Sequence, residues 1–322
     1  MQNDKLTVGI AQIAPVWLNR EATLAKIIDY TNQAADAGCE LVAFGEALLP
    51  GYPIWLDWTD GSRFNSAIQK RIHAHYVDQA VQIEAGHLQP LQTVAAKRKI
   101  AVYVGTIERA ADRGGHSVYC SLVYIDQQGV IQSVHRKLMP TYEERLTWST
   151  GDGHGLRTHK LGAFTAGGLN CWENWMPLPR AALYGMGEDL HIAVWPGGVR
   201  NTSRTTQFLA REGRSYVLAA SGLMRLTDFP ADTPHLDIIM ADMHTEVTDG
   251  ILSNGGSAIA NPDGSYLVEP VVDVEKLIVA EIDHRRVREE RQNFDAAGHY
   301  SRPDVTRLIV NRQRQSTVEI VD

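Results

Sequence analysis

The first 44 residues contain an apolar run, an amphipathic segment and a second apolar run, and this order constrains the fold more than any other feature. Residues 6–13 (LTVGIAQI) are rich in β-branched side chains and have the length of a strand. Apolar residues then recur at helical spacing over residues 24–35, with Asn19 as a cap before them and Gly38 after them. Residues 40–44 (ELVAF) are again strand-like. The order predicts a βαβ unit with parallel strands.

The same alternation continues along the chain. Further strands are expected at residues 100–107, 118–125, 130–134, 156–161, 163–169, 191–195, 216–220, 257–260, 265–268 and 277–282. Helices are expected at residues 67–83, 88–97, 173–186 and 205–214 and from His284 onward, with a loop at 54–64 and an irregular excursion at 227–249. We therefore expect one α/β domain over residues 1–322, with a core over about 5–283, a C-terminal helix and tail over 284–322, and sheets covered on both faces.

Charge and composition exclude several classes of protein. The formal net charge of −7 lacks the clustered basic excess that a nucleic-acid surface requires. Three widely spaced cysteines exclude a disulfide framework and a cysteine-rich zinc site. No apolar run approaches the roughly 18 residues of a membrane span, and the first residues do not resemble a signal peptide. We expect a cytoplasmic globular protein without nucleic-acid or membrane partners.

Cys171 lies in the segment GGLNCWENWMP (residues 167–177), where small and apolar residues precede it and helix-compatible polar residues follow it. This pattern predicts a strand, a sharp turn and a helix start with the sulfur at the corner. Backbone N–H groups and the helix dipole at such a corner favour the nucleophilic thiolate. A lone cysteine is more often a buried, inert residue. Cys39 and Cys120 fit that interpretation, because both lie in or beside apolar segments without charged neighbours.

Two charged residues at strand ends complete a possible reactive group. Glu46 follows an expected buried strand and has apolar neighbours on both sides, so desolvation would make it a proton acceptor near neutral pH. Lys137 ends another strand and precedes a loop (139–153) dense in proline, glycine, charge and tryptophan, which indicates a functional loop. A surface carboxylate and a solvated basic cluster are the alternatives. With Cys171, the two residues would supply a base, a cation and a nucleophile.

Together these segments resemble the nitrilase superfamily, the carbon–nitrogen hydrolases with a Glu–Lys–Cys triad. The matching motifs are Phe44-Gly45-Glu46, Arg136-Lys137-Leu138 and Cys171-Trp172-Glu173-Asn174, and the resemblance runs from residues 8–12 to residues 298–304. The chain is most similar to the true nitrilase branch through PGYP (residues 50–53), Glu144-Arg145 and HYSRPD (residues 299–304). It departs from the pattern at Gly45, where proline is commonest, at Asn174, where histidine is frequent, and in its short tail. The glycine would loosen the backbone before Glu46, and the short tail puts spiral assembly in doubt.

The resemblance implies an αββα sandwich that pairs into an αββααββα dimer or a larger homo-oligomer. It implies a nitrilase that converts a small organic nitrile into the carboxylic acid and ammonia through a thioimidate and a thioester on Cys171. Glu46 would act as the base, and Lys137 would stabilise charge together with a backbone N–H near Trp172. Glu144 would orient the substrate or Lys137. No metal or cofactor is required, because the thiol supplies the nucleophile.

Aromatic residues near these motifs are candidates for the substrate pocket. Tyr52, Trp148, Trp172 and Trp195 are expected to line it, although each could instead be core packing. Such a pocket would suit an apolar or aromatic group on the nitrile. The sequence leaves open whether that group is aryl, arylacetyl or aliphatic. An amidase or nitrile hydratase with the same triad is the nearest alternative, and a non-catalytic assembly module or a cysteine protease with a Cys–His pair is more distant.

Overall fold

The fold contains two β-sheets, seen in a computed structural model that describes residues 4–241, 248–318 and 321. The first sheet has the strand order β13-β1-β2-β3-β4-β5, and the second has the order β10-β11-β9-β8-β7-β6, with β12 paired to β11. The first sheet contains β1 (Lys5–Gln12), β2 (Leu41–Phe44), β3 (Ala101–Arg109), β4 (Val118–Ile125), β5 (Ile131–Arg136) and β13 (Lys276–Asp283). The second contains β6 (His159–Leu161), β7 (Phe164–Asn170), β8 (Leu190–Trp195), β9 (Tyr216–Ser221), β10 (Leu223–Arg225), β11 (Ile251–Ala260) and β12 (Tyr266–Val272).

The βαβ unit expected at the start of the chain is confirmed. β1 pairs with β2 in parallel, and β2 pairs with β3 in parallel. Helix α1 (Arg20–Asp36) connects β1 to β2, and the Asn19 side chain accepts a hydrogen bond from the Ala22 N–H at 3.0 Å. The cap satisfies a donor that the first helical turn leaves free. The second sheet repeats the pattern, since β7, β8 and β9 are parallel neighbours.

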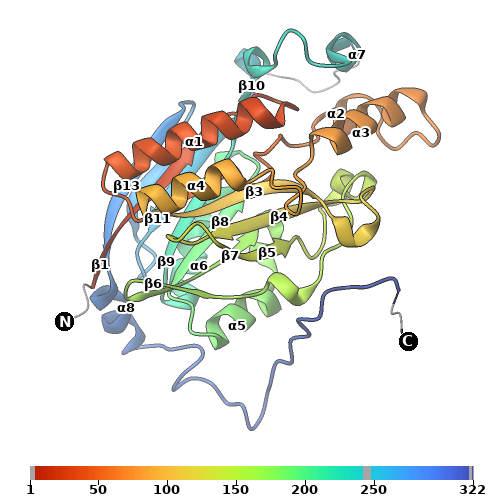
Figure 1. Ribbon diagram of the computed structural model, residues 1–322. Coiled ribbons are helices and arrows are strands. Elements are labelled where there is room, and N and C mark those ends of the chain that lie inside the picture. Colours follow the sequence, from red (N-terminus) through yellow and green to blue (C-terminus); the bar gives the residue numbers. More distant parts are fainter. Residues whose placement is uncertain (1–3, 242–247, 319–320, 322) are drawn as a thin grey trace.

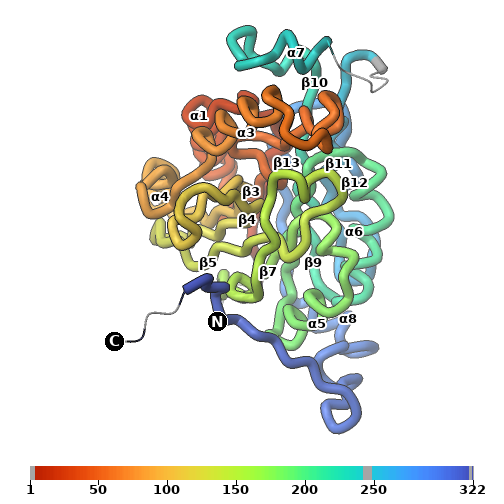
Figure 2. The backbone as a smooth tube through the Cα atoms, turned by 90° about the vertical axis from the view of Figure 1, so that its right-hand side faces the viewer, coloured from red at the N-terminus to blue at the C-terminus, as the bar shows by residue number. Residues whose placement is uncertain are grey.

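The two sheets pack face to face, and helices cover their outer surfaces. One buried cluster joins side chains of both sheets, including Val8 and Ile10 of β1 and Ile192 and Val194 of β8. Helices α1 and α4 (Gln89–Arg98) lie on one side of the paired sheets, and α6 (Val199–Gly213) lies on the other, as Figure 2 shows. The arrangement is the expected αββα sandwich, and it explains why the strands are apolar on both faces.

Three expected segments differ in detail from the structure. The predicted loop at 54–64 contains helix α2 (Trp55–Trp58), because its tryptophans pack into an aromatic cluster with Phe229; the ring centroids of Trp58 and Phe229 are 6.1 Å apart. The helix predicted from residue 173 is instead a five-residue 3-10 turn followed by α5 (Pro177–Gly185). The predicted excursion at 227–249 contains α7 (Leu236–Ala241), and its residues 242–247 lie outside the described residues.

The chain ends in α8 (His284–Arg291), which begins where the sequence predicts, and a tail without helix or strand as far as the tail is described. Figure 1 shows this tail running in an extended path below the sandwich toward the other end of the molecule. Helix α3 (Ala67–Gln79) completes the α-helices of the described residues. None of the described helices combines the length and the apolar character that crossing a membrane requires.

Candidate active site

The three sequence motifs meet where their strands end. Glu46 follows β2, Lys137 follows β5 and Cys171 follows β7. The Lys137 Nζ lies 2.8 Å from Oε1 of Glu46 and 2.7 Å from Oε2 of Glu144. One oxygen of Glu46, one oxygen of Glu144 and the sulfur of Cys171 lie within 4.8 Å of one another. Four residues from three distant segments of the chain thus form one buried group.

Tight turns hold these residues in place. Cys171 has a φ of +46°, Ala47 beside Glu46 has +52°, and Tyr142 near Glu144 has +44°. A non-glycine residue in this left-handed region costs of order 1–3 kcal/mol, and such residues cluster at functional sites. The glutamate turn also packs closely on β3, because a Cβ at Gly105 would lie 2.2 Å from the Gly45 oxygen. Each of the three segments therefore has a strained backbone turn at or near its residue of the buried group.

Gly45 does not loosen the backbone before Glu46, contrary to the expectation from the sequence. A Cβ at this position would lie 2.9 Å from the backbone nitrogen of Gly222. The next N–H, that of Glu46, donates to the Trp195 oxygen at 3.1 Å. The glycine thus lets the glutamate turn pack directly against the second sheet.

Glu46 has one occupied and one open carboxylate oxygen. Its Oε1 accepts from Lys137 and from the Cys120 thiol at 3.3 Å. Its Oε2 is buried and has no hydrogen-bond partner among the described residues. Burial raises the pKa of Glu46 to about 7, although Lys137 opposes the shift and Glu144 adds to it. The expectation of a proton acceptor poised near neutral pH agrees with this direction.

Lys137 is a buried cation between two carboxylates. Burial alone would lower its pKa, but the charges of Glu46 and of the other acidic groups raise the pKa of Lys137 well above its usual value. Glu144 is held in turn by the Thr141 N–H at 2.6 Å and the Tyr52 hydroxyl at 3.0 Å. The two carboxylates therefore favour the charged ammonium form and hold it between them.

The Cys171 thiol is buried, and its pKa differs from the expectation. Burial and the charge of Glu46 raise the pKa of Cys171 well above that of a free thiol, although Lys137 and the Trp172 N–H oppose the shift. The expected stabilisation of a resting thiolate is therefore wrong. The physical reason is that a 3-10 turn of five residues replaces the expected helix start, so little helix dipole opposes desolvation. The sulfur must lose its proton during the reaction, and the open oxygen of Glu46 is available to accept it.

Cys120 was expected to be a core residue without charged neighbours. Its side chain is buried, but its thiol donates to Glu46, and its backbone oxygen accepts from the Lys137 N–H at 2.7 Å. The sequence could not indicate this, because β4 comes next to the two charged residues only in the folded sheet. Burial raises the pKa of Cys120 well above its usual value, so it stays a thiol and a hydrogen-bond donor.

Glu173 is a further residue of the site that was matched only as part of a motif. Its carboxylate accepts from the Leu138 N–H at 2.6 Å, the Asn170 N–H at 2.8 Å and the His135 Nε2 at 3.1 Å. It thereby ties the residue after Lys137 to the residue before Cys171. Burial alone would raise the pKa of Glu173, but these donors, His135 foremost, hold it below its usual value. Asn170 and Glu173 have the spacing of a capping box, and this spacing was the signal in the sequence that could have identified Glu173.

A cavity of about 330 Å³ opens above the buried group. Cys171 and Glu144 line it, together with Tyr52, Trp172 and a mainly apolar wall of Ile54, Pro196, Met224 and Leu252, while Arg200 also contributes to the lining. Trp148 and Trp195 are not among the lining residues, which departs from the expectation that all four aromatics line the pocket. Trp148 is buried beneath Lys137, 5.4 Å from Nζ to the ring centroid, and Trp195 is buried in the core near α6.

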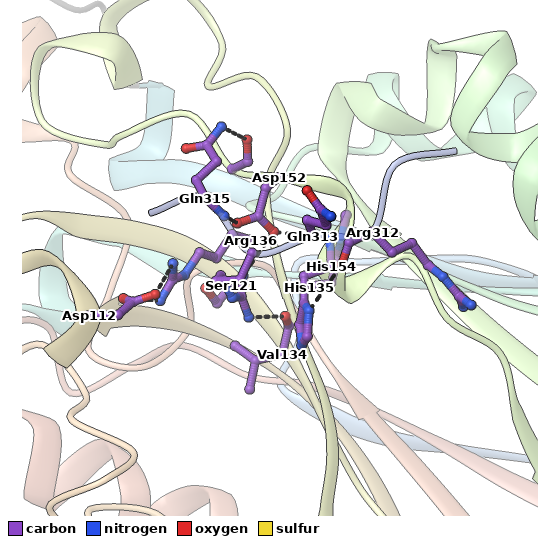
Figure 3. Close-up of polar contacts among 12 residues, drawn as sticks. Asp112, Ser121, Val134, His135, Arg136, Asp152, His154, Arg312, Gln313 and Gln315 are labelled. Carbon is purple, nitrogen blue, oxygen red and sulfur yellow. Dashed lines mark hydrogen bonds and ion pairs between the residues drawn. The ribbon is translucent and has the colours of Figure 1, made fainter. Parts of the chain in front are cut away.

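Ion pairs support the end of β5, the strand that precedes Lys137. The C-terminal tail contacts the loop that follows Lys137. Arg136 is paired with Glu108 at 2.7 Å and Asp112 at 2.8 Å. Asp152 accepts from the tail, from Arg314 at 3.0 Å and from the Gln315 N–H at 2.9 Å. Figure 3 shows Gln315 beside Asp152 and Arg136 directed toward Asp112. The tail therefore holds the loop whose Gly151 N–H donates to the Lys137 oxygen at 2.8 Å.

The chain is similar to known enzymes over nearly its whole length. Residues 7–292 match the carbon–nitrogen hydrolase family. The chain is 36% identical to "Nitrilase 2" of an unknown prokaryotic organism (99% of this chain, 96% of that one) and 33% identical to the aliphatic nitrilase of Sinorhizobium fredii (98% of each chain). Its fold is similar to that of the C. elegans NitFhit protein, with a TM-score of 0.70 and 16% identity over 98% of this chain and 70% of that one. The chain therefore belongs to the carbon–nitrogen hydrolase family, with the nitrilases among its relatives.

Proposed function

We propose that this protein is a nitrilase that converts a small organic nitrile into its carboxylic acid and ammonia, with Cys171 as the nucleophile. The observation that carries the proposal is the open Oε2 of Glu46, in a carboxylate that lies next to the sulfur and is balanced by the Lys137 ammonium. The nitrilase relatives support the substrate class. The buried site supplies a nucleophile, a base and a cation, and its Cys171 lines the cavity.

The proposed reaction starts when the sulfur attacks the nitrile carbon while its proton passes to Glu46. The new carbon–sulfur bond gives a thioimidate, whose nitrogen takes up the proton. Glu46 then removes a proton from water, which adds to the same carbon and gives a tetrahedral intermediate. Glu46 gives that proton to the nitrogen and then transfers the proton of the new hydroxyl group to it as well, so ammonia leaves and a thioester remains. A second water, activated in the same way, releases the acid and restores the Cys171 thiol.

Two donors are proposed to stabilise the charge that develops during these steps. These donors are the Lys137 ammonium and the Trp172 N–H, and each favours the anionic form of the Cys171 sulfur. They are held before the substrate arrives, so little reorganisation is required during the reaction. Glu144 is proposed to position Lys137, because it accepts from Nζ at 2.7 Å and is itself held by two further donors.

The proposed substrate carries an apolar group. Ile54, Met224 and Leu252 form an apolar part of the cavity wall, beside polar residues such as Asn201 and Ser253. Tyr52 and Trp172 are proposed to contact the substrate. A cavity of about 330 Å³ admits a small molecule only. This agrees with the relative named aliphatic nitrilase.

A panel of nitriles and their matched amides, with detection of ammonia and of the organic product, tests the proposal. We expect ammonia and acid from at least one small nitrile and no turnover by Cys171→Ala. Mass spectrometry of the wild-type enzyme during turnover should detect an adduct on Cys171. Release of the amide alone would indicate a hydratase, and turnover of amides alone would indicate an amidase. Turnover of a nitrile by Cys171→Ala at the wild-type rate would refute the mechanism.

We also propose that the protein forms a homodimer or a larger homo-oligomer through its α5 and α6 face. Trp175, Leu178 and Phe208 are all more than half exposed there, and exposed apolar side chains grouped in this way are typical of interfaces. Light scattering after gel filtration gives the mass, and Phe208→Glu should lower it. A monomeric wild-type protein would contradict this proposal.

A further inference from the structure

Three buried polar residues form a chain of hydrogen bonds that begins at the cysteine turn and does not include Glu46 or Lys137. The amide nitrogen of Asn174 donates to the Cys171 oxygen at 2.8 Å and to the Leu169 oxygen at 3.2 Å. The amide oxygen lies 2.7 Å from Nε2 of His191, and Nδ1 of His191 lies 2.9 Å from Oε1 of Glu188. All three side chains are buried. The proposed mechanism uses none of them.

The hydrogen-bond pattern determines how many protons this chain carries. Because the Asn174 nitrogen is directed at two carbonyls, its oxygen must face His191. An amide oxygen and a carboxylate both accept, so a hydrogen must lie on each side of the imidazole ring. The pair is then either an imidazolium beside a carboxylate or a neutral imidazole beside a carboxylic acid. In both cases one hydrogen lies between His191 and Glu188 and another lies between His191 and Asn174.

Among the described residues, His191 is the hydrogen-bond partner of the Glu188 carboxylate. Glu188 Oε2 is buried and has no partner among the described residues, and a Cβ at Gly167 would lie 2.3 Å from Oε1. The charged and titratable groups packed around the pair are Arg180 and Tyr184 of α5, Glu212 of α6, Arg291 of α8 and Tyr103 of β3. The Arg180 guanidinium pairs with Glu212 at 2.6 Å, and that of Arg291 donates to the backbone oxygen of Glu188.

Asn174 is connected to the reacting sulfur through one peptide unit. The Cys171 oxygen and the Trp172 N–H belong to the same planar trans peptide, so they point in opposite directions. Holding the oxygen at Asn174 therefore turns the Trp172 N–H toward the cysteine side chain. We propose that Asn174 is a positioning residue that aims the Trp172 N–H, and that the hydrogen-bonded pair of His191 and Glu188 holds the Asn174 amide in place.

Loss of the two Asn174 donors would leave the Cys171 and Leu169 oxygens without this support. The Trp172 N–H would then lose its fixed direction. The proposed arrangement therefore predicts a fall in kcat when the Asn174 amide can no longer donate.

Two substitutions of similar size test the inference, whose kinetic readout rests on the proposed nitrilase activity. Asn174→Asp keeps an acceptor for His191 but removes both donors, so kcat should fall about 100-fold or more with little change in KM, as for loss of a donor to a developing anion. Glu188→Gln can donate to Nδ1 of His191, whose Nε2 then donates to Asn174, so the chain of hydrogen bonds stays intact. This variant should retain kcat.

Asp189→Asn is the matched control. Asp189 forms a partly buried pair with His284 at 2.8 Å at the same end of β8. Its substitution should leave kcat unchanged. Thermal unfolding of each variant separates a loss of fold from a loss of positioning. Wild-type kcat in a folded Asn174→Asp would overturn the positioning role. A folded Glu188→Gln that loses as much kcat as Asn174→Asp would overturn the role of His191 and Glu188.

Alkylation of Cys171 by iodoacetamide, followed by mass spectrometry, gives a readout that does not require a nitrile. If the wild-type enzyme releases ammonia from no nitrile, the proposed function fails, while the alkylation rates still test the inference. Asn174→Asp should be alkylated more slowly than the wild-type enzyme at the same pH, because its thiolate loses a backbone donor. Equal rates would count against the inference alone.

Discussion

The Cys120 thiol offers a sensitive test of the site, because it touches the proposed base without contacting the substrate cavity. It donates to Oε1 of Glu46 at 3.3 Å, and this hydrogen bond stabilises the charged form of the carboxylate. Cys120→Ala removes the donor, so the pKa of Glu46 should rise from its value of about 7. Cys120→Ser supplies a stronger O–H donor in a similar volume, so the pKa of Glu46 should fall.

The size of the shift follows from the strength of the bond. A hydrogen bond to a charged group contributes about 1.5–3 kcal/mol, and a thiol is a weak donor, so we assign about 0.7 kcal/mol to this bond. One pKa unit corresponds to about 1.4 kcal/mol, which gives an upward shift of about 0.5 units in Cys120→Ala. Because kcat/KM follows the unprotonated fraction of the base, we compare kcat/KM as a fraction of each enzyme's own plateau. One unit below the wild-type midpoint, this fraction should be about threefold lower in the variant than in the wild-type enzyme.

The measurement is kcat/KM from ammonia release between about pH 5.5 and 9, the range in which a base with a pKa near 7 titrates. The acid limb should lie at higher pH in Cys120→Ala than in the wild-type enzyme, and at lower pH in Cys120→Ser. Cys39→Ala is the control: Cys39 is also buried, but it packs near Gly9 and should not move the limb. The reasoning is refuted if both Cys120 variants shift the limb in the same direction, or if neither does.

Three further predictions follow from the buried polar contacts. Glu173→Gln replaces one accepting oxygen by a donor, so one of its three partners is left unpaired at a cost of about 1–3 kcal/mol; urea unfolding should show this loss and kcat should fall, whereas unchanged kcat would deny that Glu173 links the two turns. Lys137→Met leaves Glu46 and Glu144 without their buried cation, so the free energy of unfolding at pH 8 should fall by about 3–5 kcal/mol. The fall should be smaller at pH 5, where the carboxylates can protonate, and equal falls at both pH values would contradict this. Arg314→Ala removes a partly exposed bond to Asp152 that contributes up to about 1 kcal/mol, so limited proteolysis should remove the tail faster while Tm barely changes; an unchanged cleavage rate would show that this contact does not hold the tail.

Much of the fold could be predicted because its signals are local. The lengths and spacing of apolar runs identify strands and helices, so β1, α1 and β2 lie close to their expected bounds. The small helix α2 was missed because its tryptophans are stabilised by contacts with residues such as Phe229, which is distant in sequence. The beginning of α5 was misplaced because a 3-10 turn before Pro177 has the same residue preferences as a helix start.

The amino-acid sequence by itself determined the order of the strands and helices, the family, and the motifs that contain Glu46, Lys137 and Cys171. Only the tertiary structure decided how these side chains behave. It placed the Cys120 thiol on Glu46, left one oxygen of that carboxylate open, and buried the Cys171 sulfur so that its pKa rises. Periodicity depends on neighbours in the chain, whereas desolvation and charge depend on neighbours in space. Those neighbours come from strands more than 70 residues apart, and only the packed sheets bring them together.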